Sequence, residues 1–338
     1  MAGYANVLGS AQLSGGYGSN LMPPQAITEI LQAAPKASAL LTMANKVQMS
    51  AGTARQSVLG SAPDAYWVRS EPKSDSKSGM KETDLQAWED IVITAEELAV
   101  VVPIPDNVVA DARIDLWSQV APRVAEAIGR KLDQAGIFGA DMPVSFGTSL
   151  LAGAIAAGNV ITRNRDIPVS TSGTGANAAS TSRKSDLGED VAEAGKRLRK
   201  QGYGISGFAS APGIEWELIG LRNGQGTPIY VPSLAAGTPS TLYGKPMGEV
   251  DNGAWDDAQA SIIAADWSKV VVGIRQDIEY RIFSEGVITD AAGKVLLNLM
   301  QADSKAMRVT FRAGFVVANP LTALQKDKTK RYPAAIVK

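Results

Sequence analysis

The residue patterns in this chain that could support chemistry are three Ser-x-x-Lys motifs and one Gly-x-Gly-x-x-Gly motif. The Ser-x-x-Lys motifs begin at Ser70, Ser74 and Ser78. A serine nucleophile of this kind needs a rigid helix start and a lysine shielded from water. Three copies within one hydrophilic stretch indicate instead a composition rich in Ser and Lys. We therefore interpret residues 70–82 as an exposed loop.

The glycine motif runs from Gly202 to Gly207. In a dinucleotide site, this motif leaves a strand and opens a helix, so that the pyrophosphate meets the helix N-terminus. Here a predicted helix precedes the motif and a predicted strand follows it. We therefore interpret the motif as a helix end and a turn.

The chain contains no His and no Cys among its 338 residues. Histidine is the usual general base near neutral pH, and cysteine supplies disulfides, thiolate metal ligands and nucleophiles. Most catalytic triads, zinc sites and redox sites therefore lack their residues, and we expect no enzymatic activity, no cofactor and no metal. The carboxylates Asp251, Asp256 and Asp257 could hold a hard cation, but a polar turn around Asn252 is favoured.

Positive and negative charges balance, with 33 Lys and Arg against 34 Asp and Glu. The chain lacks the basic excess of tight nucleic-acid binders, so a protein that recognises DNA sequence is not expected. The first basic residue is Lys36, which does not fit a secretory signal. The most apolar stretch, residues 150–161, is too short to span a membrane, so no membrane partner is expected.

Residues 115–138 carry the strongest helical signal. Apolar residues recur there every four positions and predict one buried face: Leu116, Val120, Val124, Ile128 and Leu132. Charged residues, including Asp133, supply the polar remainder. Pro122 predicts either a kink or a helix that begins near it.

A second helix is predicted at 186–200, where the apolar residues share one side and the last turn is basic. A continuous apolar run at 98–104 predicts a well-buried strand. Further strands are predicted at 205–209, 228–231, 261–264, 270–274, 278–282 and 307–318. The low-complexity residues 168–185 are interpreted as a mobile loop. Helices and strands do not alternate regularly, so the pattern predicts an α+β fold.

Two segments are predicted to be extended. Residues 1–35 contain a single charge and several Gly and Pro, which indicates an arm that becomes ordered only against a partner. Residues 70–82 lie between two strand segments, 66–68 and 88–93, and form a hairpin-like loop. With about twelve residues per limb at about 3.3 Å each, the loop could project about 40 Å, a reach that favours contact with a neighbouring molecule.

Six short strings occur in the order found in the major capsid proteins of tailed bacteriophages, which this chain resembles. The strings are YWVRSE at 66–71, the strand pair and short helix at 91–112, a helix with Trp216 followed by GTPIY at 226–230, LYGKPM at 242–247, ADWS at 265–268 before VVGIR at 271–275, and MRVTFRAGF at 307–315 before NPLTAL at 319–324. Residues 115–139 occupy the position of the family's spine helix. The resemblance covers most of the chain and implies a Hong Kong 97-like capsid fold.

This resemblance also implies a division of the chain. An N-terminal arm would occupy 1–62, an extended loop 63–92 and an axial domain 151–270. A peripheral domain would begin at 93–150, with the spine helix at 115–138, and return at 271–338 with a C-terminal tail. The loop would make contacts between subunits through Trp67, Glu71, Lys73, Lys77, Lys81 and Trp88.

The implied function is that of a major capsid protein, a structural protein of the virion. Pentamers and hexamers would self-assemble into an icosahedral shell around double-stranded DNA, with non-specific contacts to that DNA. Assembly is expected in the cytoplasm of the bacterial host. Expected partners are other copies, a portal protein, in some shells a decoration protein, and a scaffolding protein. The scaffold is expected to be a separate chain because Trp67 leaves room only for an arm before the loop.

The chain departs from the family at one site. The family's prototype crosslinks its subunits through a loop lysine, an asparagine and a nearby glutamate. The corresponding positions here fall near Asp303 and Thr310, with Asn298 upstream, so covalent crosslinking is not expected. Two alternatives remain open. One is the shell of an encapsulin-type compartment, which shares the fold and carries an internal cargo-peptide site, and the other is a small hydrolase using Ser and carboxylates.

Overall fold

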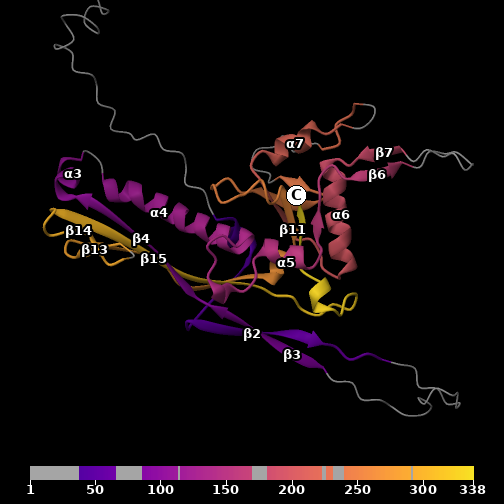
Figure 1. The fold of residues 1–338 in the computed structure, drawn as a ribbon, viewed down its shortest axis with the longest axis horizontal. Coiled ribbons are helices and arrows are strands. Elements are labelled where there is room, and N and C mark those ends of the chain that lie inside the picture. Colours follow the sequence, from indigo (N-terminus) through magenta and orange to yellow (C-terminus); the bar gives the residue numbers. More distant parts are fainter. Residues whose placement is uncertain are drawn as a thin grey trace, which may run out of the picture.

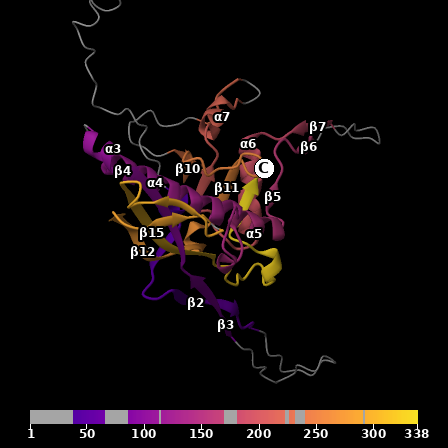
Figure 2. The ribbon, with the colours of Figure 1, turned by 60° about the vertical axis from the view of Figure 1, so that its left-hand side comes forward.

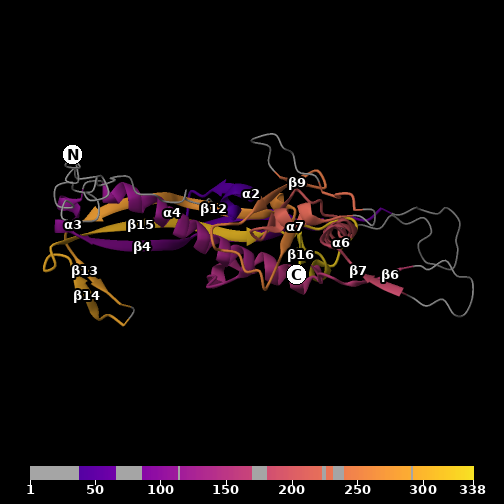
Figure 3. The ribbon, with the colours of Figure 1, turned by 90° about the horizontal axis from the view of Figure 1, so that it is seen from above.

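The computed structural model describes residues 38–65, 86–112, 115–169, 181–222, 226–230, 240–290 and 292–338. Within them, the chain forms a flat, elongated body with a four-stranded sheet running from one end and a six-stranded sheet at the other (Figures 1 and 3). Helices and strands are mixed without regular alternation, which confirms the predicted α+β class.

The four-stranded sheet has the order β1 (Asn45–Gln48), β12 (Val270–Phe283), β15 (Ser304–Val317), β4 (Glu96–Pro105). β15 is antiparallel to both β12 and β4, whereas β1 is parallel to β12. The strands predicted at 270–274 and 278–282 form one strand, with shifts in register on both sides of Gln276. Irregularities of this kind bend a strand and increase its twist.

Strand β4 confirms the strand predicted at 98–104, but the prediction that it is well buried was wrong. β4 is an edge strand whose side chains alternate between half-buried and exposed, and Val101 is 45% exposed. Pro103 and Pro105 lack a backbone N–H, which suits them to a sheet edge. The continuous apolar run therefore belongs to a strand with one open face.

The spine helix α4 (Leu116–Asp133) lies along the four-stranded sheet (Figures 1 and 2). The side chain of Asp115 caps it by accepting a hydrogen bond from the backbone N–H of Trp117. The helix passes through Pro122, so the alternative prediction that it begins near this residue was wrong. A π-helical turn, η1 (Gln134–Phe138), continues α4 and ends at Gly139, close to the predicted end.

The apolar face predicted for this helix is confirmed, and its burial deepens toward the C-terminus. Leu116 and Val120 are half-buried, whereas Val124, Ile128 and Leu132 are buried against the sheet. Their packing includes Phe311 and Phe315 of β15 in one continuous core. The spine helix is thus fixed to the sheet most firmly near the middle of the molecule.

The six-stranded sheet has the order β5 (Val160–Ile161), β16 (Ala334–Val337), β11 (Ile262–Ala265), β8 (Gly207–Ser210), β10 (Lys245–Glu249), β9 (Thr241–Leu242). Helix α6 (Leu187–Lys200) packs on it with the predicted apolar side buried, including Val191 and Leu198. Helices α5 (Leu150–Ala156) and α7 (Ile214–Gly220) lie nearby (Figure 1). Residues 228–230 form only a bridge from Pro228 to Arg222 instead of the predicted strand.

Strand β16 lies inside this sheet, parallel to β5 and antiparallel to β11, and all four of its residues are buried. The sequence-based division grouped residues 271–338 with the peripheral part, whereas residues 334–337 pair with strands of the expected axial part. The string Ala-Ala-Ile-Val is short and uniformly apolar, so it carries no periodicity that could tell which sheet it joins.

An extended hairpin, β2 (Thr53–Ser61) with β3 (Ala87–Thr94), projects from the body (Figure 1). The first limb was expected at 66–68, which lie outside the described residues, and within the described residues β3 pairs with residues inside the predicted arm at 1–62. Within that arm, α2 (Ala39–Met43) and β1 also join the body. The string of β2 lacks a clean alternation of apolar and polar residues, which is the signal that would have marked it as a strand.

Smaller elements complete the described residues. Two further hairpins are β6 (Asp166–Val169) with β7 (Thr181–Lys184), and β13 (Val287–Thr289) with β14 (Val295–Asn298). β6 and β7 occupy the flanks of the loop predicted at 168–185, and residues 170–180 lie outside the described residues. Short helical turns are α3 (Asp106–Asp111), η2 (Val144–Phe146), η3 (Trp267–Lys269) and η4 (Lys328–Lys330).

Candidate functional site

The extended hairpin carries the one predicted contact residue that falls within the described part of the chain, Trp88. The others, Trp67, Glu71, Lys73, Lys77 and Lys81, lie outside it, as do the Ser-x-x-Lys motifs. Trp88 lies in β3 opposite Leu59 of β2 and is 64% exposed. Val92, four residues on and therefore on the same face of the strand, is also exposed. Apolar side chains gathered on a projecting element are typical of a contact surface.

The hairpin is attached to the body at two levels. Near its base, Ile93 is buried together with Met49. Farther out, the backbone N–H of Leu321 donates to the carbonyl of Leu59 at 2.9 Å. Two separate attachments along one ribbon fix its direction as well as its position.

An ion pair between Lys328 and Glu89 joins the hairpin to the segment before β16 at the outer level. A hydrogen bond from the Lys328 ammonium, with its positive charge, lowers the pKa of the Glu89 carboxyl. Both side chains are largely exposed, so water and salt screen the pair and its contribution to stability is small. It orients the hairpin more than it stabilises the fold.

The opposite end of the molecule presents a second apolar surface, the tip patch. It combines the end of β12, the β13–β14 hairpin and the turn that follows, and its members are Ile282, Phe283, Val287, Val295, Leu296 and Met300. Leu296 is 63% exposed. Figure 3 shows the β13–β14 hairpin leaving the flat body at this end. The molecule thus carries exposed apolar surface on two separate projecting elements.

Sequence reasoning missed the hairpin of the tip patch, although a local signal was present. The carboxylate of Asp290 accepts hydrogen bonds from the backbone N–H groups of Ala292 and Lys294, and Gly293 has a φ of +81°. An Asp followed three residues later by Gly, between two short apolar strings, is typical of a tight turn.

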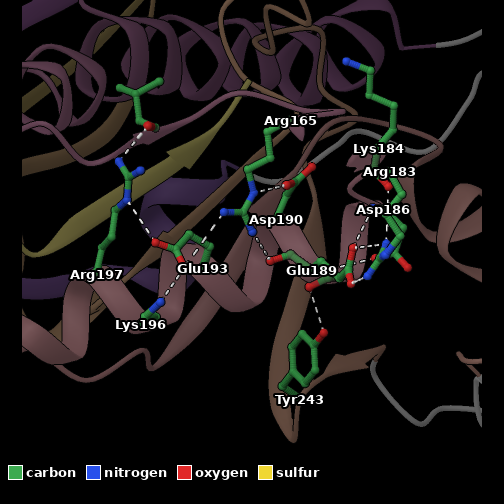
Figure 4. A network of polar contacts seen from close by, with 12 residues as sticks. Arg165, Arg183, Lys184, Asp186, Glu189, Asp190, Glu193, Lys196, Arg197 and Tyr243 are labelled. Atoms are coloured by element: carbon green, nitrogen blue, oxygen red, sulfur yellow. Dashed lines mark hydrogen bonds and ion pairs between the residues drawn. The ribbon is translucent and has the colours of Figure 1, made fainter. Parts of the chain in front are cut away.

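A polar network on α6 holds the β6–β7 hairpin in place (Figure 4). Arg165 donates from Nε to the buried carboxylate of Asp190 at 2.9 Å. Arg183 of β7 donates to Glu189 in the first turn of α6, and its hydrogen bond lowers the pKa of that carboxyl. Asp186 caps the helix in a reciprocal capping box with Glu189. This third projecting element therefore has a fixed base.

A buried carboxylate joins distant parts of the chain. Asp133 accepts hydrogen bonds from the hydroxyl of Ser38, the backbone N–H groups of Ala39 and Leu40, and the side-chain amide of Asn252. Burial raises the pKa of Asp133, although all four donors favour its ionised form. The prediction of Asp133 as part of the polar surface was wrong, because it is 0% exposed.

A comparison of the sequence with family models decides what kind of protein has this architecture. The model of the phage capsid family matches residues 18–326, which is most of the chain. The chain belongs to the phage capsid family. None of the curated proteins compared with it matches.

Solved structures agree with this assignment to the phage capsid family. A chain from Microbacterium phage Oxtober96 is 30% identical with a TM-score of 0.76, covering 98% of this chain and 99% of that chain. A chain from Mycobacterium phage Adephagia is 26% identical with a TM-score of 0.78, covering 98% of each. A capsid chain of an empty GTA particle, at 17% identity, 98% and 99% coverage and a TM-score of 0.61, shares the fold. The predicted capsid fold is confirmed, and the chain is a structural component of the virion capsid shell.

The glycine motif and Asp256, one of the candidate cation ligands, have structural roles in this capsid chain, whereas the Ser-x-x-Lys motifs lie outside the described residues. Gly202, with a φ of +90°, follows Gln201, the C-cap of α6, and precedes β8, which confirms the helix end and turn. The carboxylate of Asp256 accepts from the backbone N–H of Ala258 and closes a polar turn. Within the residues that the structure describes, no cluster of acidic side chains is placed to hold a metal, and no helix is long and apolar enough to cross a membrane.

Proposed function

We propose that copies of this capsid chain assemble into pentamers and hexamers, which close into an icosahedral shell around double-stranded DNA. The observation that carries the proposal is the apolar surface that one copy leaves in water on two projecting hairpins, the tip patch and the face of β3 with Trp88 and Val92. Apolar patches on projecting elements favour burial against other proteins. Other copies of the chain are the partners that a shell supplies.

The shape of the subunit supports a ring. The body is flat, and its two apolar projections leave different parts of it (Figures 1 and 3). Two different patches on one chain favour head-to-tail contacts, which close into rings when the rotation between neighbours allows it. In this proposal, the axial part at 151–270 meets around the ring axis. The peripheral parts at 93–150 and 271–338 make contacts between rings.

The arm at 1–62 and the loop at 63–92, with Trp67, Glu71, Lys73, Lys77 and Lys81, would overlap neighbouring copies in this shell. The support is the hairpin β2–β3, whose two described strands project from the body. Overlap of this kind adds buried area that a compact outline cannot supply. Deleting residues 70–82 should leave a folded subunit that assembles poorly, whereas unchanged shell yield would count against this role.

The partners proposed with the shell are a separate scaffolding protein, a portal protein and, in some shells, a decoration protein, with assembly in the host cytoplasm. Contact with packaged DNA would be non-specific, because the net formal charge of −1 gives no basic excess for tight binding. The encapsulin-type and hydrolase alternatives lose support, since the matched family is a phage capsid family and similar structures come from phages.

The test compares Leu296→Glu with Leu296→Met in the tip patch. The purified wild-type chain, with its phage's scaffolding protein, should form closed shells in negative-stain microscopy and sediment as large particles. Leu296→Met keeps the apolar surface and should behave the same. Leu296→Glu places a charge in the contact and should remain a small, folded species by circular dichroism. A wild-type chain that stays monomeric at high concentration with its scaffold present would overturn the proposal.

A further inference from the structure

The extended hairpin crosses the four-stranded sheet where two neighbouring strands both carry glycine. Gly273 of β12 is paired with Gly314 of β15, and the crossing residues are Ile93 and Thr94 of β3. Glycine is unfavourable inside a strand unless something needs the space of its missing side chain. Here the missing side chains leave room for another strand to lie directly on the sheet.

Neighbouring atoms fill the space beside the two glycines, so neither position has room for a Cβ atom. A Cβ on Gly314 would lie 2.5 Å from the carbonyl oxygen of Thr94 and 2.8 Å from Cγ2 of Ile93. A Cβ on Gly273 would lie 2.9 Å from the same Ile93 atom and 2.5 Å from the Met49 sulfur. These separations are shorter than van der Waals contact. We call the two glycines with Ile93 between them the glycine seat.

The two halves of the seat differ in what would have to move. At Gly273 the obstacles are side chains, and the Met49 side chain is flexible. At Gly314 the nearest obstacle is the backbone of β3 itself, at the carbonyl group of Thr94. The backbone N–H of Ala95 donates to the carbonyl of Gly52 at 2.8 Å, which closes the hairpin base next to Thr94. Relief at Gly314 therefore requires the hairpin to shift as a unit.

Such a shift changes the direction of the hairpin. Its outer attachment includes the hydrogen bond from Leu321 to Leu59, which lies five residue pairs beyond Ile93 along β2 and β3. At about 3.3 Å per residue this is a lever of about 17 Å, so lifting its base by about 1 Å turns the ribbon by several degrees. Trp88, which is paired with Leu59, would then meet a neighbouring copy at a different angle.

We infer that the glycine seat sets the angle at which the β2–β3 hairpin leaves the body, and that this angle selects the curvature and diameter of the shell. The second half of the inference rests on the proposed function, because it concerns contacts between copies. The first half concerns one subunit alone. An assembly angle repeated around a closed shell makes its diameter sensitive to a few degrees.

The experiment measures the angle and the shell separately. The chain has no Cys, so Gln56→Cys on the hairpin and Ala192→Cys on α6 take two spin labels, and pulsed electron paramagnetic resonance gives the distance between them. Shell diameter is measured by electron microscopy. The label distance and the shell diameter are both determined for Gly314→Ala and for Gly52→Ala. Gly52→Ala is the matched control at the hairpin base, because its added Cβ would meet nothing within 4 Å.

Gly314→Ala should shift the label distance by a few ångströms and yield shells of altered diameter or open assemblies, whereas Gly52→Ala should change neither. An unchanged label distance in Gly314→Ala would overturn the inference. A shifted distance with shells of unchanged diameter would overturn its second half and leave the proposed function standing. If the wild type forms no shells, the proposed function fails, while the label distances still decide whether the seat sets the angle.

Ile93→Ala keeps the test decisive if Gly314→Ala does not fold. This variant removes most of the Ile93 side chain from the seat without changing either glycine. The angle at which the hairpin leaves the body should then no longer be fixed. The label distances should spread into a broader distribution, and the shells should vary in diameter. A distribution as narrow as that of the wild type would show that the seat does not set the angle.

Discussion

The buried carboxylate of Asp133 lies 2.7 Å from the hydroxyl of Ser38, which precedes it by 95 residues. Asp133 ends the spine helix, and Ser38 caps α2. Asn252, which follows β10, reaches the same carboxylate at 2.6 Å. One side chain therefore fixes the spine helix, the segment before β1 and the loop after β10 relative to one another.

Asp133→Ala should destabilise the unassembled subunit by about 3–5 kcal/mol, because it leaves several buried donors without an acceptor. Asn252→Ala removes one donor and should cost about 1–2 kcal/mol. Urea unfolding followed by circular dichroism measures both. A cost below about 1 kcal/mol for Asp133→Ala would contradict the role assigned to this carboxylate.

Stability should fall at alkaline pH through buried tyrosines. The Tyr203 hydroxyl, which contacts Asn319 and the carbonyl of Pro320, is buried, and burial raises its pKa to about 12. Burial also raises the pKa of Tyr332. A raised pKa favours the protonated form in the folded state, so its stabilisation is complete below pH 10 and is lost as the pH rises toward 12.

Tyr203→Phe tests this alkaline effect. It should cost about 1 kcal/mol at neutral pH through the lost hydrogen bond, yet lose less stability than the wild type between about pH 9.5 and 11.5. Thermal unfolding across that range measures the difference. Some alkaline loss of stability should remain in Tyr203→Phe, because burial also raises the pKa of Tyr332. Parallel profiles for the two proteins would show that Tyr203 does not titrate in this way.

Gly153→Ala should destabilise the protein although alanine is the better helix former. A Cβ at this position of α5 would lie 2.1 Å from the ring of Tyr332, so we expect a cost of about 1–3 kcal/mol from overpacking. The control is Gly220→Ala in α7, where a Cβ meets nothing within 4 Å and a gain of up to about 1 kcal/mol is expected. Thermal unfolding should move in opposite directions for the two variants.

Trp88→Ala separates assembly from folding. Because Trp88 is mostly exposed, its removal should change the unfolding free energy of the single subunit by no more than about 0.5 kcal/mol. Shell yield should fall, because the largest apolar side chain on the described face of the hairpin is lost. Val144→Ala, at a residue that is 96% exposed on η2, is the matched control. Equal shell yields for the two variants would contradict the prediction that Trp88 contacts a neighbouring copy.

The sequence predicted the elements whose signals are local. The four-residue spacing in α4, and the apolar side with a basic last turn in α6, were enough to place both helices. The first limb of the hairpin was missed because β2 has no clear alternation, and β16 because four apolar residues have no measurable period. The burial of Asp133 depends on partners 95 and 119 residues away in the chain, which no window of sequence reveals.

The candidate contact surfaces were less predictable than the fold. Trp88 was predicted as a contact residue, and the structure shows it exposed, but its contact with a neighbour stays a prediction. The tip patch was missed because Val287 and Leu296 belong to residue types that are usually buried. Their exposure follows from the projection of the β13–β14 hairpin, and so from the course of the whole chain.

The position of β16 has a consequence for synthesis on the ribosome. Residues 334–337 emerge after all the other strands of their sheet, yet they lie between two of them. Until they arrive, β5 and β11 each present an open edge of unpaired N–H and C=O groups, a feature that promotes aggregation. Nascent and prematurely terminated copies therefore have a gap between β5 and β11, and only translation through residue 337 pairs the facing edges of both strands.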